Sequence, residues 1–204
     1  MEDRLLAHRQ HRERVQQYKE TAAKSCYSLI IIVVALVLLR PVMVDQILSL
    51  ASAYSSVGLF DQSMRQCDKA LLIDGESSGA WCQSARNYKI RGDREMAYGA
   101  YQKAVQADPL DRSASFELGM MYVEDDRHQL AIPHFEQVRK LGREKAAAYG
   151  PTQNSYHRRS LEMLVLCYEK ENDTAMMEVA LKEARIFYPH SAIARDYLSQ
   201  LPQK

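Results

Sequence analysis

The sequence predicts an all-α protein: a single N-terminal transmembrane helix, then an α-solenoid of about four helix hairpins, then a C-terminal capping helix. Two observations carry this prediction. An uncharged apolar stretch lies close to the N-terminus, as expected for a membrane anchor. Tyrosine and alanine then recur at a fixed spacing through the rest of the chain, which indicates one structural unit repeated several times.

Composition excludes some classes of protein. The chain has 204 residues, of which 47% are hydrophobic and 26% charged, enough apolar material for a packed core. The net charge is +1; residues 1–24 hold six basic and four acidic residues, whereas residues 25–204 hold 21 and 22. A nucleic-acid-binding protein usually carries a basic face, so the nearly neutral body argues against nucleic acid as a partner.

Residues 25–44 are predicted to be a transmembrane anchor that contacts the lipid bilayer. No charge occurs between Lys24 and Arg40, and a soluble core helix is rarely apolar on all sides. As a helix, the uncharged residues 25–39 would span about 22 Å, less than the hydrocarbon core of about 30 Å. The two flanking basic side chains would therefore reach toward the interfaces, or the helix would continue through residues 42–44.

A cleaved signal peptide is the alternative for this stretch, because its apolar region has a similar length. The nearest small-residue site, at residues 51–53, lies beyond Arg40 and Asp45, and cleavage there would remove part of the first predicted repeat. We therefore favour an uncleaved anchor. The basic excess before the anchor predicts that residues 1–24 form a charged cytoplasmic tail. In a bacterium this describes a single-pass inner-membrane protein with periplasmic repeats; an ER or mitochondrial inner-membrane location stays open.

Two columns of residues share one spacing. The first consists of Tyr54, Tyr88, Tyr122 and Tyr168, which follow one another at 34, 34 and 46 residues. The same offsets connect Ala70, Ala104, Val138 and Ala184. The sequence therefore predicts a 34-residue period with one insertion of twelve residues.

This pattern resembles the tetratricopeptide repeat, a helix-turn-helix unit with the motif W-x2-L-G-x2-Y, then A-x3-F, then A and P. The most complete copy, residues 78–111, carries Trp81, Tyr88, Ala97, Tyr101, Ala104 and Pro109. Further copies are assigned to residues 44–77, 112–145 and 158–191, with an insertion at 146–157 and a capping helix and tail at 192–204. The first copy has Cys67 where the large aromatic residue belongs, and the third lacks the final proline.

The resemblance implies which residues are structural. The repeat positions named for this role are Tyr54, Trp81, Tyr88, Tyr122, Phe135 and Tyr168. Small residues such as Ala85 and Gly119 would let the two helices of a hairpin approach closely, and Gly58 and Gly92 would lie in the turns between them.

The resemblance also implies a concave groove, lined by the first helix of each unit, that binds protein partners. The candidate groove residues are Arg86, Lys89, Phe116, Met120, Val123, Arg159 and Glu162. A basic pair beside an apolar patch would suit an extended peptide or helix with an acidic residue next to aliphatic ones. A solvated helix face without a partner is the alternative for the basic pair. The Lys/Asn arrangement of the members that bind chaperone tails is replaced by Leu48, Ser52, Phe116 and Met120, so no binding of such a tail is predicted.

No enzymatic activity, catalytic residue, metal site, cofactor or small-molecule substrate is predicted. The six histidines are scattered, and the chain contains no glycine-rich phosphate loop and no nucleophile elbow. Cys67 and Cys82 are expected to be packed thiols, while a disulfide between them stays open for an oxidising compartment.

The sequence thus predicts a membrane-tethered interaction scaffold or assembly factor for envelope or membrane protein complexes. The alternative is a permanent accessory subunit of one membrane complex, held through both its transmembrane helix and its repeats. In either case the expected partners are membrane or envelope proteins.

Overall fold

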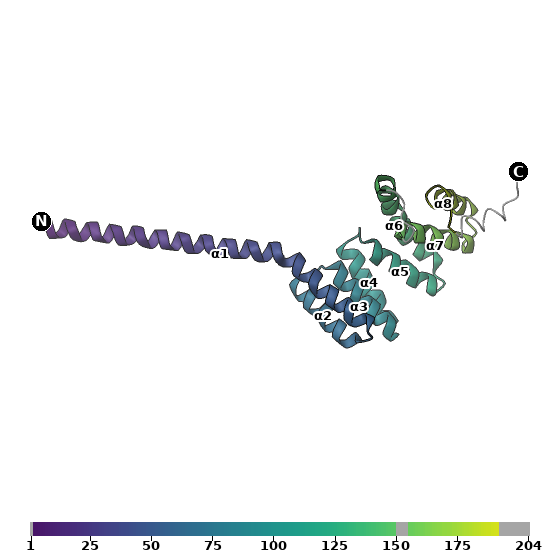
Figure 1. Cartoon of the computed structure of the whole chain (residues 1–204), viewed down its shortest axis with the longest axis horizontal. Coiled ribbons are helices and arrows are strands. Elements are labelled where there is room, and N and C mark those ends of the chain that lie inside the picture. The colour runs from purple at the N-terminus through teal and green to yellow at the C-terminus, as the bar shows by residue number, and fades with distance from the viewer. Residues whose placement is uncertain (1, 150–154, 192–204) are drawn as a thin grey trace. The chain divides into compact units, whose positions relative to one another are not determined.

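The structure is a computed structural model that describes residues 2–149 and 155–191. The chain divides into two units, Met1–Gln46 and Ile47–Lys204. Every regular element in the described ranges is a helix, and there are eight of them (Figure 1). The predicted all-α class is therefore confirmed. The predicted capping helix at 192–204 lies outside the described residues.

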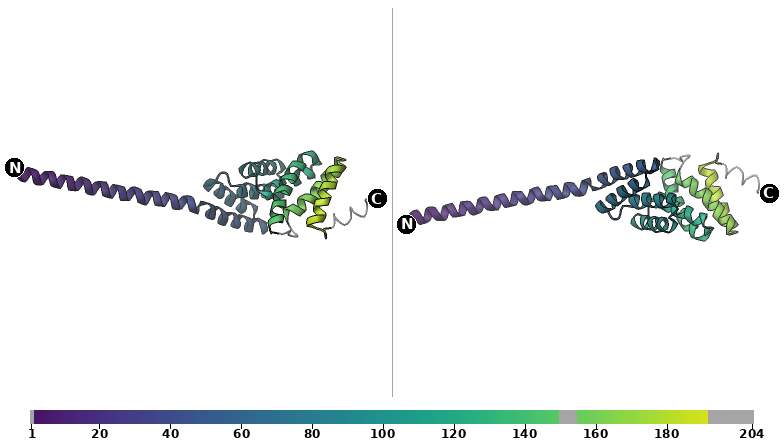
Figure 2. Two further views of the ribbon diagram at one scale, coloured as in Figure 1. Left: turned by 90° about the horizontal axis from the view of Figure 1, so that it is seen from above. Right: turned by 90° about the horizontal axis from the view of Figure 1, so that it is seen from below.

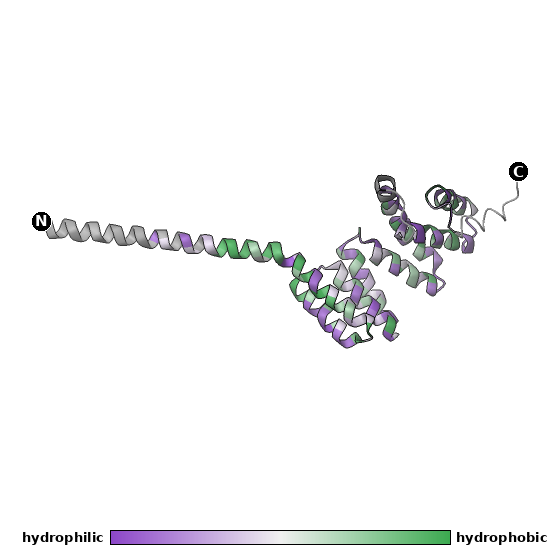
Figure 3. Ribbon diagram, viewed as in Figure 1, coloured by the Kyte–Doolittle hydropathy of each residue, from purple (hydrophilic) through white to green (hydrophobic). Residues whose placement is uncertain are grey.

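The first unit is formed by the N-terminal part of helix α1 (Glu2–Ser56), which runs past Pro41 without interruption. Within α1, Tyr27–Ser56 is long and apolar enough to cross a membrane, and its most apolar window has a mean hydropathy of 2.5 (Figure 3). Only 6% of its most apolar window is buried, unlike a core helix of a soluble protein. By length, composition and position, the segment fits an anchor or a signal sequence.

The second unit contains four helix hairpins. The end of α1 pairs with α2, and the other pairs are α3 with α4, α5 with α6, and α7 with α8 (Figures 1 and 2). The bounds are α2 (Phe60–Ile73), α3 (Ser78–Arg91), α4 (Arg94–Ala107), α5 (Arg112–Glu124), α6 (His128–Tyr149), α7 (Tyr156–Lys170) and α8 (Thr174–Phe187). Helix α5 packs against both α3 and α7. The first helices of hairpins 2, 3 and 4 therefore form one continuous layer.

The four tyrosines of the first column occupy equivalent places. Each tyrosine carbonyl accepts a hydrogen bond from the backbone N–H five residues later, at 2.8–2.9 Å, and these donors are Leu59, Asp93, Arg127 and Asp173. The residue just before each donor has a positive φ: Gly58 (80°), Gly92 (86°), Asp126 (55°) and Asn172 (58°). This is the helix-ending turn that satisfies carbonyls at a helix C-terminus. The four turns therefore follow one another at the spacing of the tyrosines.

The second column marks where three of the second helices end. The carbonyls of Ala70, Ala104 and Ala184 accept hydrogen bonds of 2.7–3.0 Å from the N–H four residues later. At the equivalent Val138 the helix does not end, and α6 continues to Tyr149. The extra turns of α6 include residues 146–149, the first part of the predicted insertion at 146–157. Helix α7 begins at Tyr156, two residues before the predicted start of the fourth repeat.

Two apolar clusters fill the later hairpins. One, between hairpins 2 and 3, includes Tyr101, Leu118 and Met121. The other, between hairpins 3 and 4, includes Phe135 and Tyr168. A Cβ added to Gly119 would lie 2.9 Å from the Phe135 ring, so the close helix approach predicted for this small residue is present.

The first hairpin contributes no residue to these two clusters. It is joined to the second hairpin by a buried polar network. The Asn87 side chain donates to Ser63 Oγ at 2.8 Å and accepts from Ser55 Oγ at 2.9 Å. Ser63 Oγ in turn donates to the carbonyl of Ala51 at 2.7 Å. Asn87 and Ser63 are fully buried, as are the small side chains of Ala51 and Ala80, so buried hydrogen bonds join the two hairpins beside small apolar contacts.

Candidate partner-binding face

Most of the predicted groove residues lie on the layer of first helices. We define the first-helix face as the exposed or half-buried side chains contributed by α3, α5 and α7 from the predicted set. These are Arg86, Lys89, Met120, Val123, Arg159 and Glu162. Because α5 packs between α3 and α7, the structure brings them onto one surface.

Phe116 was expected to line the groove, but its side chain is buried. Its side chain is 1% exposed and packs against Phe135 and Tyr156, with ring centroids 5.4 and 5.5 Å apart. The guanidinium carbon of Arg159 lies 4.3 Å from the Phe116 ring centroid on the outer side. Phe116 therefore belongs to the core, and Arg159 takes its place on the surface through a cation–π contact.

The remaining apolar part of the face comes from one helix. Met120 and Val123, both on α5, are half-buried and pack against the cluster of hairpins 3 and 4. Part of each side chain stays accessible, so these two residues stay candidates for apolar contacts with a partner.

Two of the charged residues are already paired within the chain. Lys89 Nζ lies 2.6 Å from Glu124 Oε1, and Glu162 pairs with Arg158 on the same helix. Ion pairs that are partly exposed are worth about 0–1 kcal/mol. A charged partner could therefore displace either pair at little cost.

Arg86 has a different environment. Its Nη2 donates to Ser113 Oγ at 2.7 Å, and the hydroxyl of Tyr156 donates to the same oxygen at 3.0 Å. The sulfur of Cys82 lies 3.9 Å from Ser113 Oγ. Residues from α3, α5 and α7 thus meet at one hydroxyl.

Tyr101 adds a fourth polar group from α4. Its phenol is fully buried, and no described group hydrogen-bonds to its oxygen. Burial raises the pKa of Tyr101, as do Glu117 and Cys82, while Arg86 acts in the opposite direction. A buried hydroxyl without a partner costs about 1–3 kcal/mol. We call Arg86, Ser113, Tyr156 and Tyr101 the Arg86 cluster.

The cysteines of the first two hairpins are buried. Cys67 and Cys82 are both buried free thiols, so the open alternative of a disulfide between them is not observed. Burial raises the pKa of the Cys82 thiol to about 11, and it therefore stays protonated at neutral pH.

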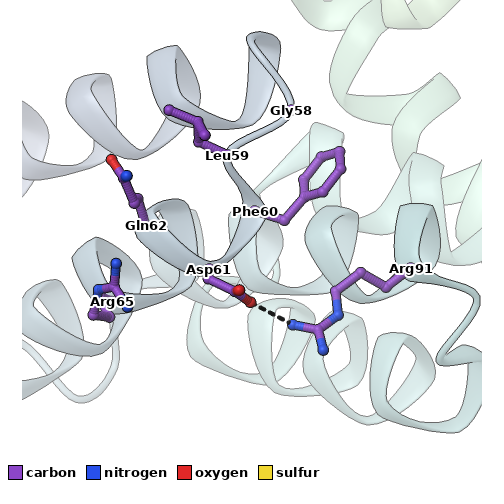
Figure 4. A pocket seen from close by; sticks show the side chains of 7 residues that line it. All are labelled: Gly58, Leu59, Phe60, Asp61, Gln62, Arg65 and Arg91. Carbon is purple, nitrogen blue, oxygen red and sulfur yellow. Dashed lines mark hydrogen bonds and ion pairs between the residues drawn. The ribbon is translucent and has the colours of Figure 1, made fainter.

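A shallow cavity of about 450 Å³ lies away from the face, at the turn edge of the first two hairpins. Figure 4 shows Arg91 reaching Asp61 across it, with Nη1 and Oδ1 3.0 Å apart. This pair ties the end of α3 to the start of α2, so we assign the residues around it a structural role. Among the described residues, no group of three or more His, Cys, Asp or Glu side chains is placed to hold a metal ion.

The sequence comparison agrees with the geometry of the second hairpin. Residues 78–109 match the family model described as tetratricopeptide repeat. No curated protein matches the sequence.

Solved structures extend this likeness to the stack. MamA (residues 41 to the end) from Desulfovibrio magneticus RS-1 is 18% identical, with a TM-score of 0.55 over 72% of this chain and 77% of that one. The type III secretion translocator chaperone SycD of Yersinia enterocolitica is 16% identical, with a TM-score of 0.53 over 63% of this chain and 85% of that one. At these identities the likeness establishes the fold of stacked helix pairs.

Sequence reasoning missed three members of the Arg86 cluster. Tyr101 was recognised only as a repeat aromatic, and Ser113 and Tyr156 were not recognised at all. Tyr156 lies 43 residues from Ser113, across the insertion, so the repeat spacing gave no indication that they meet. The one signal in the sequence was Tyr101, which carries a hydroxyl at a repeat position that usually has an apolar ring.

Proposed function

We propose that the protein is a membrane-tethered interaction scaffold or assembly factor for envelope or membrane protein complexes. In this proposal the first-helix face binds the partner, and no catalytic step is involved. The observation that carries it is the layer of first helices, which gathers apolar and basic side chains from three hairpins onto one surface. Stacked helix pairs of this kind form extended binding surfaces for proteins.

The tether is proposed from the apolar segment of α1. Its most apolar window is 6% buried and has a mean hydropathy of 2.5, so this segment would be poorly solvated in water. We further propose that the basic residues before it keep the N-terminus in the cytoplasm, which in a bacterium leaves the repeats in the periplasm. SycD, which has a similar fold, is described as a chaperone for a secretion translocator, and that supports an assembly role here.

Site-specific photo-crosslinking in native membranes tests the binding face. A crosslinking amino acid replaces Met120, which is half-buried on α5, and in a matched variant it replaces Gln102, which is exposed on α4. The proposal predicts a discrete crosslinked partner from position 120 and none from position 102. Equal crosslinks at both positions, or crosslinks from position 102 alone, would contradict it.

Stoichiometry then separates an assembly factor from a permanent accessory subunit. Purification in mild detergent should recover the crosslinked partner at less than one copy per chain if contact is transient. Recovery at a fixed ratio would overturn the assembly role in favour of the subunit. In both cases carbonate extraction should leave the chain in the membrane, whereas release into the soluble fraction would contradict the tether.

A further inference from the structure

We propose that one edge of the stack contacts the surface of the bilayer and holds a zwitterionic lipid headgroup there. The inference rests on the proposed membrane tether and specifies a second contact of the chain with lipid. The surface lies where α2 and α4 end and where α3 and α5 begin. We call it the loop edge, and its members are Leu72, Glu76, Trp81, Lys103 and Leu110.

The loop edge lies at the end of the second unit at which the chain enters from the apolar segment. The second unit begins at Ile47. Helix α2 runs antiparallel to the end of α1, because Ser63 Oγ donates to the carbonyl of Ala51 beyond the turn. From Ser63 to Leu72 the helix rises about 14 Å, whereas Ile47 lies about 6 Å before Ala51. Leu72 therefore reaches at least as far toward the entry of the chain as Ile47 does.

The loop edge exposes two large apolar side chains. Leu72 is 87% exposed, more than any other large hydrophobic side chain in the described ranges, those of the apolar segment included, and Leu110 is 67% exposed. Single exposed leucines are common on protein surfaces and need no explanation by themselves. Their position at the entry of the chain, beside the groups described next, is what favours a lipid contact.

A hollow of about 310 Å³ on the same edge has groups suited to a lipid headgroup. Its lining includes Glu76, Trp81 and Lys103. Trp81 is half-buried, and its Nε1 donates to the carbonyl of Gly75 at 3.1 Å. The ammonium of Lys103 lies 4.3 Å from the centroid of the Trp81 ring. Tryptophan and lysine both lie readily at the level of the headgroups, because each joins an apolar body to a polar tip.

A zwitterionic headgroup fits the charges around this hollow best. Lys103 and Glu76 are both exposed, and neither forms an ion pair with another described residue. A lipid phosphate can pair with Lys103, and the ammonium of the same headgroup with Glu76. An anionic headgroup would bring no positive charge to Glu76 or to the exposed Asp108 beside it, so these carboxylates would repel it.

The test uses full-length protein reconstituted in phosphatidylcholine nanodiscs, in which about a tenth of the lipid carries a nitroxide on its headgroup. Trp81 is the single tryptophan of the chain, so its fluorescence reports on the loop edge. The proposal predicts that the nitroxide lipid quenches this fluorescence about twofold or more. The double variant Leu72→Gln with Leu110→Gln should lose at least half of the quenching. The matched variant Ile90→Gln, at an isoleucine that is 59% exposed at the turn edge, should leave it unchanged.

A relocated tryptophan distinguishes contact with the bilayer from tethering alone. The variant Trp81→Phe with Ile90→Trp moves the fluorophore to the turn edge, where the same lipid should quench it less than half as strongly. Helical circular dichroism equal to that of the wild type is the control for each variant. Equal quenching at the two positions, or full quenching in the double leucine variant, would overturn the inference.

Lipid charge tests the headgroup. Replacing about a fifth of the phosphatidylcholine by phosphatidylglycerol should not increase the quenching. An increase of about twofold or more would contradict the zwitterionic headgroup, because it would mean that cations of the stack make the contact.

The outcome is separate from that of the proposed function. If carbonate extraction releases the chain, the tether fails and this inference fails with it. If the chain stays in the membrane but quenching is equal at both positions, the tether stands and only the contact of the loop edge with the bilayer is wrong.

Discussion

The first and last interfaces of the stack solve the same packing problem with different chemistry. The repeat position that wedges between hairpins is occupied in turn by Cys67, Tyr101, Phe135 and Leu181, at offsets of 34, 34 and 46 residues. All four are buried. The small thiol lies beside Ser63 and Ser84, whereas Phe135 packs among aromatic and aliphatic side chains.

The last interface adds a hydrogen-bonded chain of buried and half-buried side chains. It runs through Ser155, Tyr188, His157, Glu183, Arg139, Glu136 and Tyr168, with donor–acceptor distances of 2.7–3.1 Å. His157 is 1% exposed and Glu183 10% exposed at the side chain. The chain joins α6, α7 and α8 and includes charged groups, while the Asn87 network between the first hairpins is neutral.

The repeat pattern therefore determines the backbone conformation more strictly than the side chains between hairpins. The four turns are the same to within 0.1 Å in the tyrosine hydrogen bond, yet the interfaces between hairpins differ in volume, polarity and charge. Apolar burial contributes about 25 cal/mol per Å², so the first hairpin gains less from packing than the last. We expect it to be the least stable part of the stack.

The largest expected effect comes from truncating the wedge residue. Phe135→Ala should lower the free energy of unfolding by about 3–5 kcal/mol, because it removes a buried ring and leaves a cavity. Cys67→Ala at the equivalent position removes one small atom and should cost about 1 kcal/mol. Urea unfolding followed by the fluorescence of Trp81, the single tryptophan of the chain, measures both. Equal losses would show that the two interfaces do not differ in apolar packing.

The charged and neutral networks should differ in their pH dependence. Burial opposes ionisation of Glu183, but the hydrogen bond from His157 and the charge of Arg139 lower its pKa below the ordinary value. A carboxyl whose pKa is lower in the folded state stabilises the protein above its unfolded-state pKa, and that contribution is lost as pH falls through the folded-state pKa.

Glu183→Gln should therefore cost about 1–3 kcal/mol at neutral pH and flatten the loss of stability below about pH 4.3, the ordinary pKa of a glutamate. Asn87→Ala should cost a similar amount, since it leaves buried serine hydroxyls unpaired, but the pH profile should keep its wild-type shape. Unfolding curves collected from pH 3 to 7 distinguish the two. If the pH profile of Glu183→Gln keeps the wild-type shape, ionisation of Glu183 does not cause the loss of stability at low pH.

The turns should give the smallest effects because their backbone is shared. Gly58→Ala should cost about 1 kcal/mol, since φ is 80° and no atom lies within 4 Å of the added Cβ. Asn172→Gly should change stability by less than about 0.5 kcal/mol, because Asn tolerates the left-handed region. Thermal unfolding of both variants measures this. A large loss in Asn172→Gly would mean that its side chain has a role beyond the turn.

The sequence predicted the backbone of the stack better than its surface. Tyrosine and alanine columns located the four hairpins because turn geometry and close helix contacts admit few residue types. The same offsets also connect Gly58 and Gly92 to Asp126 and Asn172, but only the glycines were recognised as turn residues, since Asp and Asn occur in many other places.

The side-chain networks could not be predicted from the spacing. Phe116 occupies a groove position in the repeat pattern, but Tyr156 and Arg159, in the first turn of α7, cover its ring. His157 was counted among scattered histidines because its partners Glu183 and Tyr188 lie 26 and 31 residues away. Contacts of this kind depend on how far each helix rotates about its axis, which a repeat period does not specify.

Hydrogen–deuterium exchange of the full-length protein in detergent micelles tests the difference between the two ends most directly. Backbone amides of α2 should exchange through an opening of lower free energy than those of α7 and α8. Protection of α2 equal to or greater than that of α7 and α8 would contradict the account, because the polar interface would then hold as firmly as the aromatic one.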